Sequence, residues 1–282
     1  MDVSAIARKL KFNESENFWE AACDEEVVEY PENAHNFCMQ LEDVSYWFKH
    51  RNLSIGNLLK ASNFEGNFLD VGGGNGVISK YLQSQSYDVA MVEPLIAGAR
   101  NANKRGVDNI ICSTLCEAGF SPESIDGMGF FDVIEHVEDE VKLLKEARDL
   151  LKDGGSIYLT VPSYNCLYSQ SDVFAGHFRR YDKGQLKKVL ENCGFEVQFD
   201  SYIFRPLVVP IFFMRRLPYV LRKNKEVKSY LLQEEVKDHK PGGVAKLVLP
   251  VFEKILLREA RDILNKKACS FGASEIIWAK KK

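Results

Sequence analysis

A glycine-rich segment beginning at residue 72 has the residue types and spacing of a turn that holds a cofactor. Asp70 lies near the end of an apolar run, and glycines occupy positions 72, 74 and 76. Glycine lets the backbone turn sharply after a strand and approach a ligand without an intervening Cβ atom. A dinucleotide fingerprint requires glycine where Val77 stands, and the sequence lacks the Gly-Lys-Ser/Thr tripeptide of a phosphate loop. The spacing therefore favours a different nucleoside cofactor, with an ordinary strand-to-helix turn as the alternative.

A second acidic residue occupies the corresponding place one strand later. The segment 87–92 is largely apolar, ends at Glu93 and follows the glycines after a short helical stretch, which predicts a βαβ unit. Ligands of an open parallel sheet bind at the carboxyl ends of its strands, where a carboxylate can accept hydrogen bonds from both ribose hydroxyls. Glu93 is thus the predicted ribose ligand, and a solvated glutamate before a helix is the alternative.

Two histidines are candidates for a general base. His136 follows a predicted strand at 127–131, and His177 lies in a loop that we expect at the same edge of the sheet. Histidine titrates near neutral pH, so either ring could take a proton from an acceptor hydroxyl group. For both residues the alternative is a packing or loop-bracing role.

The neighbouring residues Arg179, Arg180 and Tyr181 form a further candidate cluster. A planar guanidinium group binds phosphate or carboxylate in a forked geometry. Because adjacent side chains face different ways, we expect one arginine to face the acceptor and the other to pair with a core carboxylate. The predicted catalytic set is therefore His136, His177, Arg179 and Tyr181.

These residues need a parallel sheet that brings the strand ends to one edge. Further strands are predicted at 109–112, 127–131, 156–161 and 195–199, and a closing antiparallel strand at 274–279. The fold class is thus α/β and Rossmann-like. We divide the chain into an acidic helical N-terminal cap (1–62), a cofactor-binding core (63–200), an apolar and basic insertion (201–270) and a closing strand (271–282).

Composition excludes several classes of protein. With 282 residues, 45% of them hydrophobic, the chain can bury a full α/β core. Its net charge of −3 hides an asymmetry, because residues 201–282 carry eighteen Lys/Arg against eight Asp/Glu. The seven cysteines include no C-x-x-C pair, so we expect no structural zinc. No signal peptide and no apolar run of membrane-spanning length are recognised, which favours a cytoplasmic protein with reduced thiols.

Taken together, these motifs resemble those of the class I S-adenosylmethionine-dependent methyltransferases. The shared features are the strand-Asp-Gly-x-Gly-x-Gly element, the acid at the end of the second strand, and Leu-Lys-Asp-Gly-Gly before the fifth strand. More narrowly, the chain is similar to a bacterial subgroup often found with surface-polysaccharide genes. The segments that carry this likeness are 46–52 (YWFKHRN), 129–139 (GFFDVIEHVED), 160–162 (TVP) and 176–181 (GHFRRY).

The resemblance implies a seven-stranded, mostly parallel sheet whose last strand is antiparallel, with a helical insertion before that strand. It also implies S-adenosylmethionine as the cofactor. Residues implied to bind it are Asp70, Gly72, Gly73, Gly74, Asn75, Glu93, Ser113, Thr114 and Asp132. The family commonly places an acidic residue near Ser113 to hold the adenine amino group, and this chain departs from that pattern. The subgroup implies O-methylation of a sugar or glycan intermediate and a role in polysaccharide biosynthesis.

Other functions remain open at this point. Asp132, Glu135 and His136 resemble the magnesium site of ubiquinone-pathway O-methyltransferases, which supports a quinone or catechol acceptor, although our primary prediction includes no metal. A cofactor-binding partner subunit without chemistry of its own is a second alternative, and a nicotinamide oxidoreductase is a third. A nucleic-acid acceptor is disfavoured, because no Asn-Pro-Pro-Tyr-like element follows the fourth strand.

The insertion combines bulky apolar residues with flanking cations over 204–225. Such a segment more often packs as a lid over its own active site, which is the interpretation that we favour, and it can also lie at a membrane interface. The two roles can coexist. A lipid-linked glycan would account for both the apolar stripe and the basic tail, and it would add a peripheral contact with the inner membrane face to the expected cytoplasmic location.

Overall fold

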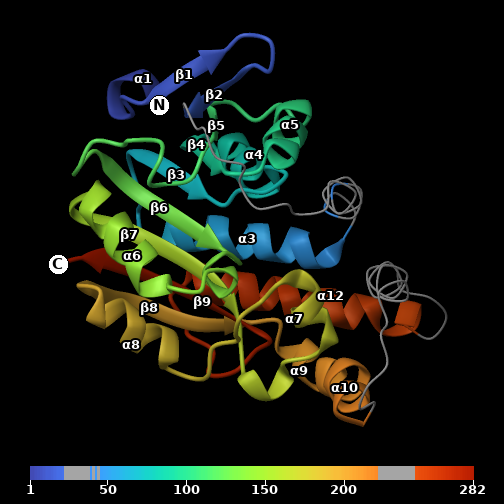
Figure 1. Cartoon of the computed structure of the whole chain (residues 1–282). Helices are drawn as coiled ribbons and strands as arrows, with labels where there is room; N and C mark the ends of the chain where they lie inside the picture. Colours follow the sequence, from blue (N-terminus) through green and yellow to red (C-terminus); the bar gives the residue numbers. More distant parts are fainter. Residues whose placement is uncertain (22–38, 40–41, 43–44, 222–244) are drawn as a thin grey trace.

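The computed structural model describes residues 1–21, 39, 42, 45–221 and 245–282, and its centre is a mixed β-sheet with helices on both faces (Figure 1). In spatial order the strands are β1-β2-β5-β4-β3-β6-β7-β9-β8. Their bounds are β1 Leu10–Asn13, β2 Phe18–Ala21, β3 Asn67–Val71, β4 Asp88–Glu93, β5 Ile110–Cys112, β6 Ile125–Phe131, β7 Leu151–Pro162, β8 Phe195–Ile203 and β9 Ser274–Lys281.

The central strands are parallel and the closing strand is antiparallel, as predicted. β3 pairs in parallel with β4 and β6, and this arrangement extends to β5 on one side and β7 on the other. β9 runs antiparallel to both of its neighbours, with Leu159 opposite Ile277 and Ser201 opposite Ile276. The carboxyl ends of the parallel strands therefore share one edge, where the candidate site residues are expected.

The number of strands corrects the prediction of seven. The described chain has nine, because an N-terminal hairpin of β1 and β2 extends the sheet beyond β5. β2 pairs in parallel with β5, where Trp19 lies opposite Ile111. The N-terminal segment was expected to be helical, but its described part contains this hairpin after the four-residue helix α1 (Val3–Ile6). Residues 22–38, 40–41 and 43–44 of the predicted cap lie outside the described residues.

Helices cover the two faces of the sheet in two hydrophobic clusters. One cluster holds side chains of α3 (Tyr46–Ala61), α4 (Val77–Ser84) and α12 (Ala245–Leu264). The other holds side chains of α1, α6 (Glu140–Leu150) and α8 (Gln185–Asn192). A smaller cluster joins α5 (Ile96–Lys104) to β4, β5 and Phe18 of the hairpin. Strand side chains alternate between the faces, as Leu69 and Phe68 of β3 do.

The described part of the insertion between β8 and β9 is mostly helical, and residues 265–273 after its last helix form turns and irregular chain. It begins at Phe204 and continues as η3 (Arg205–Leu207), α9 (Val208–Ile211), the π-helical turn η4 (Phe212–Arg216) and α10 (Leu217–Leu221). Residues 222–244 of the predicted insertion lie outside the described residues. α12 then runs alongside α3 (Figure 1). Among the described helices, none combines the length and apolarity that crossing a bilayer demands.

Candidate active site

The glycine loop leaves β3 with its backbone in conformations that suit glycine. Gly72, Gly74 and Gly76 have φ values of 71°, 56° and 75°. Gly72 N–H donates to the Val92 carbonyl over 2.8 Å, which ties the loop to β4. A Cβ atom added to Gly73 would lie 2.3 Å from Met91 Cγ, whereas one added to Gly74 would meet nothing within 4 Å. Gly73 is therefore needed for packing, and Gly74 faces open space.

Glu93 lies directly beneath this loop at the end of β4. Its Oε2 atom accepts from Gly74 N–H over 2.8 Å, and its Oε1 atom accepts from Leu95 N–H over 2.9 Å. Burial raises the pKa of Glu93 to about 7, against the two backbone hydrogen bonds, which lower it. The predicted ribose ligand thus also shapes the loop, because its carboxylate holds Gly74 in place.

Asp70 and Asn75 support the loop from either side. Ser79 Oγ donates to Asp70 Oδ2 over 2.6 Å, and burial raises the pKa of Asp70 to about 6. Asn75 is buried, and its Oδ1 atom accepts from Asn101 Nδ2 over 3.1 Å while its own Nδ2 donates to Glu42 Oε1. Both side chains therefore have protein partners that fix the loop to α4 and α5.

Ser113 and Thr114 follow β5 at the same edge. Ser113 N–H donates to the Glu93 carbonyl over 3.2 Å, which places this turn beside the predicted ribose ligand. Thr114 Oγ1 donates to Glu117 Oε2 over 2.7 Å. Sequence reasoning missed Glu117, although an acid three residues after a threonine at a strand end is the signal that could have found it.

Asp132 follows β6 and joins the core to α3. It adopts a φ of 59°, which is uncommon for a residue with a side chain. Its Oδ1 atom accepts from Thr160 Oγ1 over 3.1 Å, and its Oδ2 atom pairs with the Arg51 guanidinium. Arg51 was assigned to the cap on sequence grounds, and the structure brings it to the carboxyl edge of the sheet.

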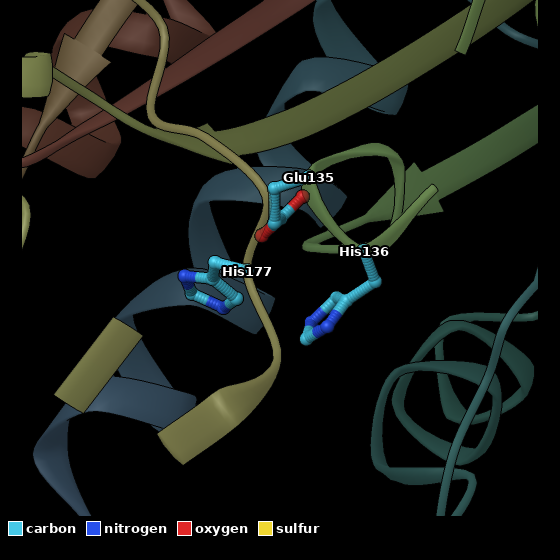
Figure 2. A group of neighbouring side chains, drawn as sticks. All are labelled: Glu135, His136 and His177. Carbon is cyan, nitrogen blue, oxygen red and sulfur yellow. The ribbon is translucent and has the colours of Figure 1, made fainter. Parts of the chain in front are cut away.

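Glu135, His136 and His177 converge beyond the end of β6 (Figure 2). Glu135 and His136 belong to the turn η1 (Ile134–His136), and the loop that carries His177 crosses beside it. One ligand-type atom from each residue lies within 4.8 Å of the other two. The rings of His136 and His177 meet edge to face, with centroids 4.6 Å apart. The structure therefore brings together the two histidines that were predicted to serve as bases.

The three residues differ in their electrostatic surroundings. Glu135 is 0% exposed, and neither carboxylate oxygen accepts a hydrogen bond from another described residue. Burial, with a contribution from Asp132, raises the pKa of Glu135 well above its ordinary range. Desolvation of the ring and the nearby His177 lower the pKa of His136 to about 4, although the residue as a whole keeps some solvent exposure. His136 is consequently neutral at pH 7.

Helix α7 (Gln170–Ala175) positions His177. Ser169 and Asp172 form a capping box at its start, and Gly176 ends it with a φ of 78°. His177 Nδ1 lies 3.0 Å from Asp172 Oδ1, and Phe178 N–H donates to the Glu135 carbonyl over 2.8 Å. The loop is thus fixed at both the helix end and the turn η1.

The structure corrects the predictions for the Arg-Arg-Tyr segment. Arg179 pairs with Glu140, and Arg180 Nε donates to Asp172 Oδ1 over 2.7 Å. Both arginines therefore bind carboxylates of the protein, whereas one was expected to face the acceptor. The main chain of Tyr181 pairs with the end of β7, where its N–H donates to the Pro162 carbonyl over 2.9 Å. Its side chain is 0% exposed and packs in the core cluster of α6 and α8, so it is closed to a substrate. The segment braces the site, because its charges compensate the buried Asp172 and the partly buried Glu140.

A buried ionic cluster joins the cap to the insertion. Glu259 of α12 accepts from Phe204 N–H over 2.9 Å and from Arg205 Nε over 2.9 Å, and it lies 3.1 Å from His50 Nε2. Trp47 stacks on Phe204 with ring centroids 3.8 Å apart. His50 therefore has a structural contact, which joins α3 to α12.

Comparison with known proteins places residues 29–198 within a family model described as a methyltransferase domain. Among solved structures, phosphoethanolamine N-methyltransferase 2 of Haemonchus contortus, in complex with S-adenosyl-L-methionine, is 18% identical with a TM-score of 0.55. That match covers 90% of this chain but 58% of the Haemonchus chain, so the chain spans less than two thirds of that relative. No match was found among curated proteins.

Two further structures have similar overlap with this chain. A methyltransferase of Thermotoga maritima, titled a possible histamine N-methyltransferase, is 20% identical with a TM-score of 0.52 and covers 89% of this chain and 97% of its own. The plantazolicin methyltransferase BamL, in complex with a substrate analogue and S-adenosylhomocysteine, is 14% identical with a TM-score of 0.54 and covers 89% of this chain and 91% of its own. At these identities the likeness is one of fold.

Proposed function

Since this chain belongs to the methyltransferase-domain family and its cofactor is S-adenosylmethionine, we propose that it transfers the methyl group to an oxygen atom of a sugar or glycan intermediate. The membership covers the class I fold and the cofactor. The identity of the acceptor is our proposal. The similar structures do not point to one substrate, since their titles name amines and a peptide natural product.

The residues of the loop fit the cofactor. Gly74 opens onto space in which an added Cβ would meet no atom within 4 Å, next to the Glu93 carboxylate that it touches. The carboxylate oxygens retain lone pairs for ribose hydroxyls after accepting one backbone hydrogen bond each. Asp70, Gly72, Gly73 and Asn75 would frame the methionine portion, and Ser113 with Thr114 would border the adenine, with the loop held as described above.

The observation that supports oxygen as the acceptor is the pair of histidine rings at the carboxyl edge. A Cβ on Gly72 would lie 2.8 Å from Val133 Cγ2, so the glycine loop directly adjoins the turn that carries His136. Methyl transfer is an in-line displacement in which the protein holds the nucleophile close to the sulfonium carbon. A neutral imidazole such as that of His136 can take the hydroxyl proton as the oxygen–carbon bond forms.

An apolar surface on the insertion supports a lipid-linked acceptor and a peripheral membrane contact. The α9–α10 surface consists of the exposed apolar residues Val209, Phe212, Phe213, Met214, Leu217, Val220 and Leu221. Arg215 and Arg216 lie within the same stretch. Apolar side chains beside cations suit the interface of an anionic bilayer. These features support our proposal of a cytoplasmic protein with this surface against the inner membrane face.

The test is an assay for S-adenosylhomocysteine release with three acceptor classes: sugar nucleotides, lipid-linked sugars and catechols. We expect turnover with a sugar acceptor, and a fall of about 10²- to 10⁴-fold in kcat for His136→Ala. Turnover with catechols alone would overturn the sugar assignment. Release with none of the acceptors, while S-adenosylhomocysteine still binds, would favour the silent cofactor-binding subunit.

The membrane contact has its own test. Sedimentation with vesicles containing anionic lipid should retain the wild-type chain and lose the Phe213→Ser, Met214→Ser double variant. As a control, Val173→Ser and Phe178→Ser change two exposed apolar residues outside the α9–α10 surface. The contact would be contradicted if the wild type did not bind the vesicles, or if the Phe213→Ser, Met214→Ser variant bound them as well as the control variant does.

A further inference from the structure

We propose that Glu135, His136 and His177 form the binding site of one divalent transition-metal ion of the zinc type (Figure 2). This site differs from the magnesium trio suggested by the sequence pattern, because it takes His177 from a separate loop in place of Asp132. The catalytic role of this ion rests on the proposed function. Binding of the ion does not, because it requires no acceptor.

The geometry brings the three ligands close to convergence. Their candidate ligand atoms lie within 4.8 Å of one another. Ligand atoms placed about 2.0 to 2.2 Å from one zinc ion are separated by at most about 4 Å. Small side-chain rotations are therefore enough to close the set around a cation, and the backbone of both segments is already joined by the 2.8 Å hydrogen bond from Phe178 to Glu135.

The state of Glu135 is the second, independent observation. Its side chain is 0% exposed, and both carboxylate oxygens lack hydrogen-bond partners among the residues that the structure describes. A buried polar group without a partner is costly, so native proteins nearly always satisfy such groups with a hydrogen bond, a water molecule or an ion. Figure 2 shows this carboxylate between the main chains that carry the two imidazole rings. A cation would satisfy it from the side on which the histidines lie.

His177 has the outer partner that metal-binding imidazoles usually have. His177 Nδ1 lies 3.0 Å from Asp172 Oδ1, so Nδ1–H is donated to the carboxylate and Nε2 keeps its lone pair. The His136 ring lies near the main chain of Gly176, where an added Cβ atom would be 3.9 Å from its Nδ1 atom. The contact with Asp172 thus fixes the orientation of the His177 ring and leaves its other nitrogen for a ligand.

The ligand types select the metal. Two imidazoles and one carboxylate suit zinc, cobalt and related ions, whereas magnesium and calcium prefer oxygen ligands throughout. Asp132 is already engaged by Arg51 and by Thr160 Oγ1, which accounts for its absence from the group. Because His136 retains solvent exposure, the ion would keep open coordination positions for a further oxygen ligand.

Those open positions connect the ion to the proposed chemistry. An acceptor hydroxyl bound to the cation would lose its proton to solvent more readily. The oxygen lone pair would then form the new bond to the methyl carbon, and the electron pair of the breaking carbon–sulfur bond would return to sulfur, giving S-adenosylhomocysteine. With the ion bound, His136 would act as a ligand instead of as the base, and the ion would promote the loss of the hydroxyl proton in its place. His136→Ala is expected to lower kcat in either case.

The test is a titration of the chelator-treated full-length chain with Co²⁺, followed by visible absorption, and with Zn²⁺ in competition with a metal-binding dye. We expect one ion per chain. Glu135→Gln and His177→Ala should each weaken the affinity at least 30-fold. Glu138→Gln is the matched control, because Glu138 is an exposed carboxylate three residues along the same segment, and it should bind as the wild type does.

Affinity for S-adenosylhomocysteine within twofold of the wild type verifies that each variant is folded. Absence of ion binding by the wild type would overturn the proposal, as would an affinity equal to that of the wild type in Glu135→Gln and His177→Ala. Because the titrations contain no acceptor, their outcomes do not depend on whether the proposed function is correct. Ion binding without turnover of any sugar acceptor would leave the metal site standing and remove the sugar assignment.

Discussion

The cofactor side of this molecule and the side that we propose for the acceptor, called the acceptor side below, are built in different ways. The cofactor side comes from one continuous stretch, β3 to β5, and its contacts are largely backbone groups and two buried carboxylates. The acceptor side is assembled from α3, η1, the loop after α7 and α12, whose partners lie up to 209 residues apart in the chain. A locally encoded site tolerates little change in its backbone, whereas an assembled site depends on long-range side-chain pairs.

The sharpest way to break the cofactor side is to replace Gly74 with valine. The residue has a φ of 56° and faces the open space of the loop, so a branched side chain would be strained and would occupy cofactor volume. We expect S-adenosylhomocysteine affinity to fall at least 1,000-fold in a calorimetric titration. Gly154→Val is the matched control, because Gly154 has a φ of 72° and equally open surroundings but lies at the start of β7. A comparable loss of affinity in that variant would mean that the effect is global unfolding.

On the acceptor side, two adjacent leucines of α12 allow the stability contribution of a buried side chain to be compared with that of an exposed one. Leu256 is 4% exposed in the cluster with α3, and Leu257 is 55% exposed. Leu256→Ala should lower the free energy of unfolding by about 3 to 4 kcal/mol, since it leaves a cavity, whereas Leu257→Ala should change it by less than about 0.5 kcal/mol. Urea unfolding measures both. Equal effects would show that α12 does not dock on α3 as described.

The pH dependence of stability tests the buried acids of the cofactor side. The folded-state pKa of Glu93, about 7, lies above its ordinary value of 4.5, so the folded state binds the proton more tightly than the unfolded state. The contribution of Glu93 is therefore greatest below pH 4.5 and is lost as pH rises through 7.

Between pH 5 and 8 we expect the ligand-free wild type to lose about 2 to 3 kcal/mol of stability through Glu93. Glu93→Gln should remove that part of the slope in urea unfolding, while the exposed-site variant Glu196→Gln should keep it. A slope unchanged by Glu93→Gln would show that this carboxyl group is not the source.

The smallest expected effect is that of an acceptor-side mutation on cofactor binding, which tests whether the cofactor side and the acceptor side are independent. His136→Ala should change S-adenosylhomocysteine affinity by less than about twofold, because Glu93, Asp70 and the glycine loop make none of their hydrogen bonds with His136 among those described. A tenfold change by calorimetry would mean that the acceptor side shapes the loop, and the division between the two sides would need revision.

This division also explains what could be predicted from the sequence. β3, the glycines and Glu93 were predictable because the strand, the turn and the acid follow one another in one motif. The hairpin β1–β2 was not, because two four-residue strands give too little periodicity to recognise. The Arg51–Asp132 pair joins residues 81 positions apart, and nothing local to either residue specifies the other. Arg179 and Arg180 were misplaced because their partners Glu140 and Asp172 meet them only in the folded chain. Tyr181 was misplaced because the core cluster that buries it also forms only on folding.

The position of β9 between β7 and β8 has a consequence for synthesis on the ribosome. Among the strands that the structure describes, β8 pairs only with β9, so the chain must emerge from the exit tunnel through residue 281 before β8 gains that partner. Until then the nascent protein carries two open strand edges, at β7 and β8, which can pair with other chains. Slow translation of the helical insertion would lengthen that interval. Chaperones that shield such edges should therefore matter most while this segment is being made.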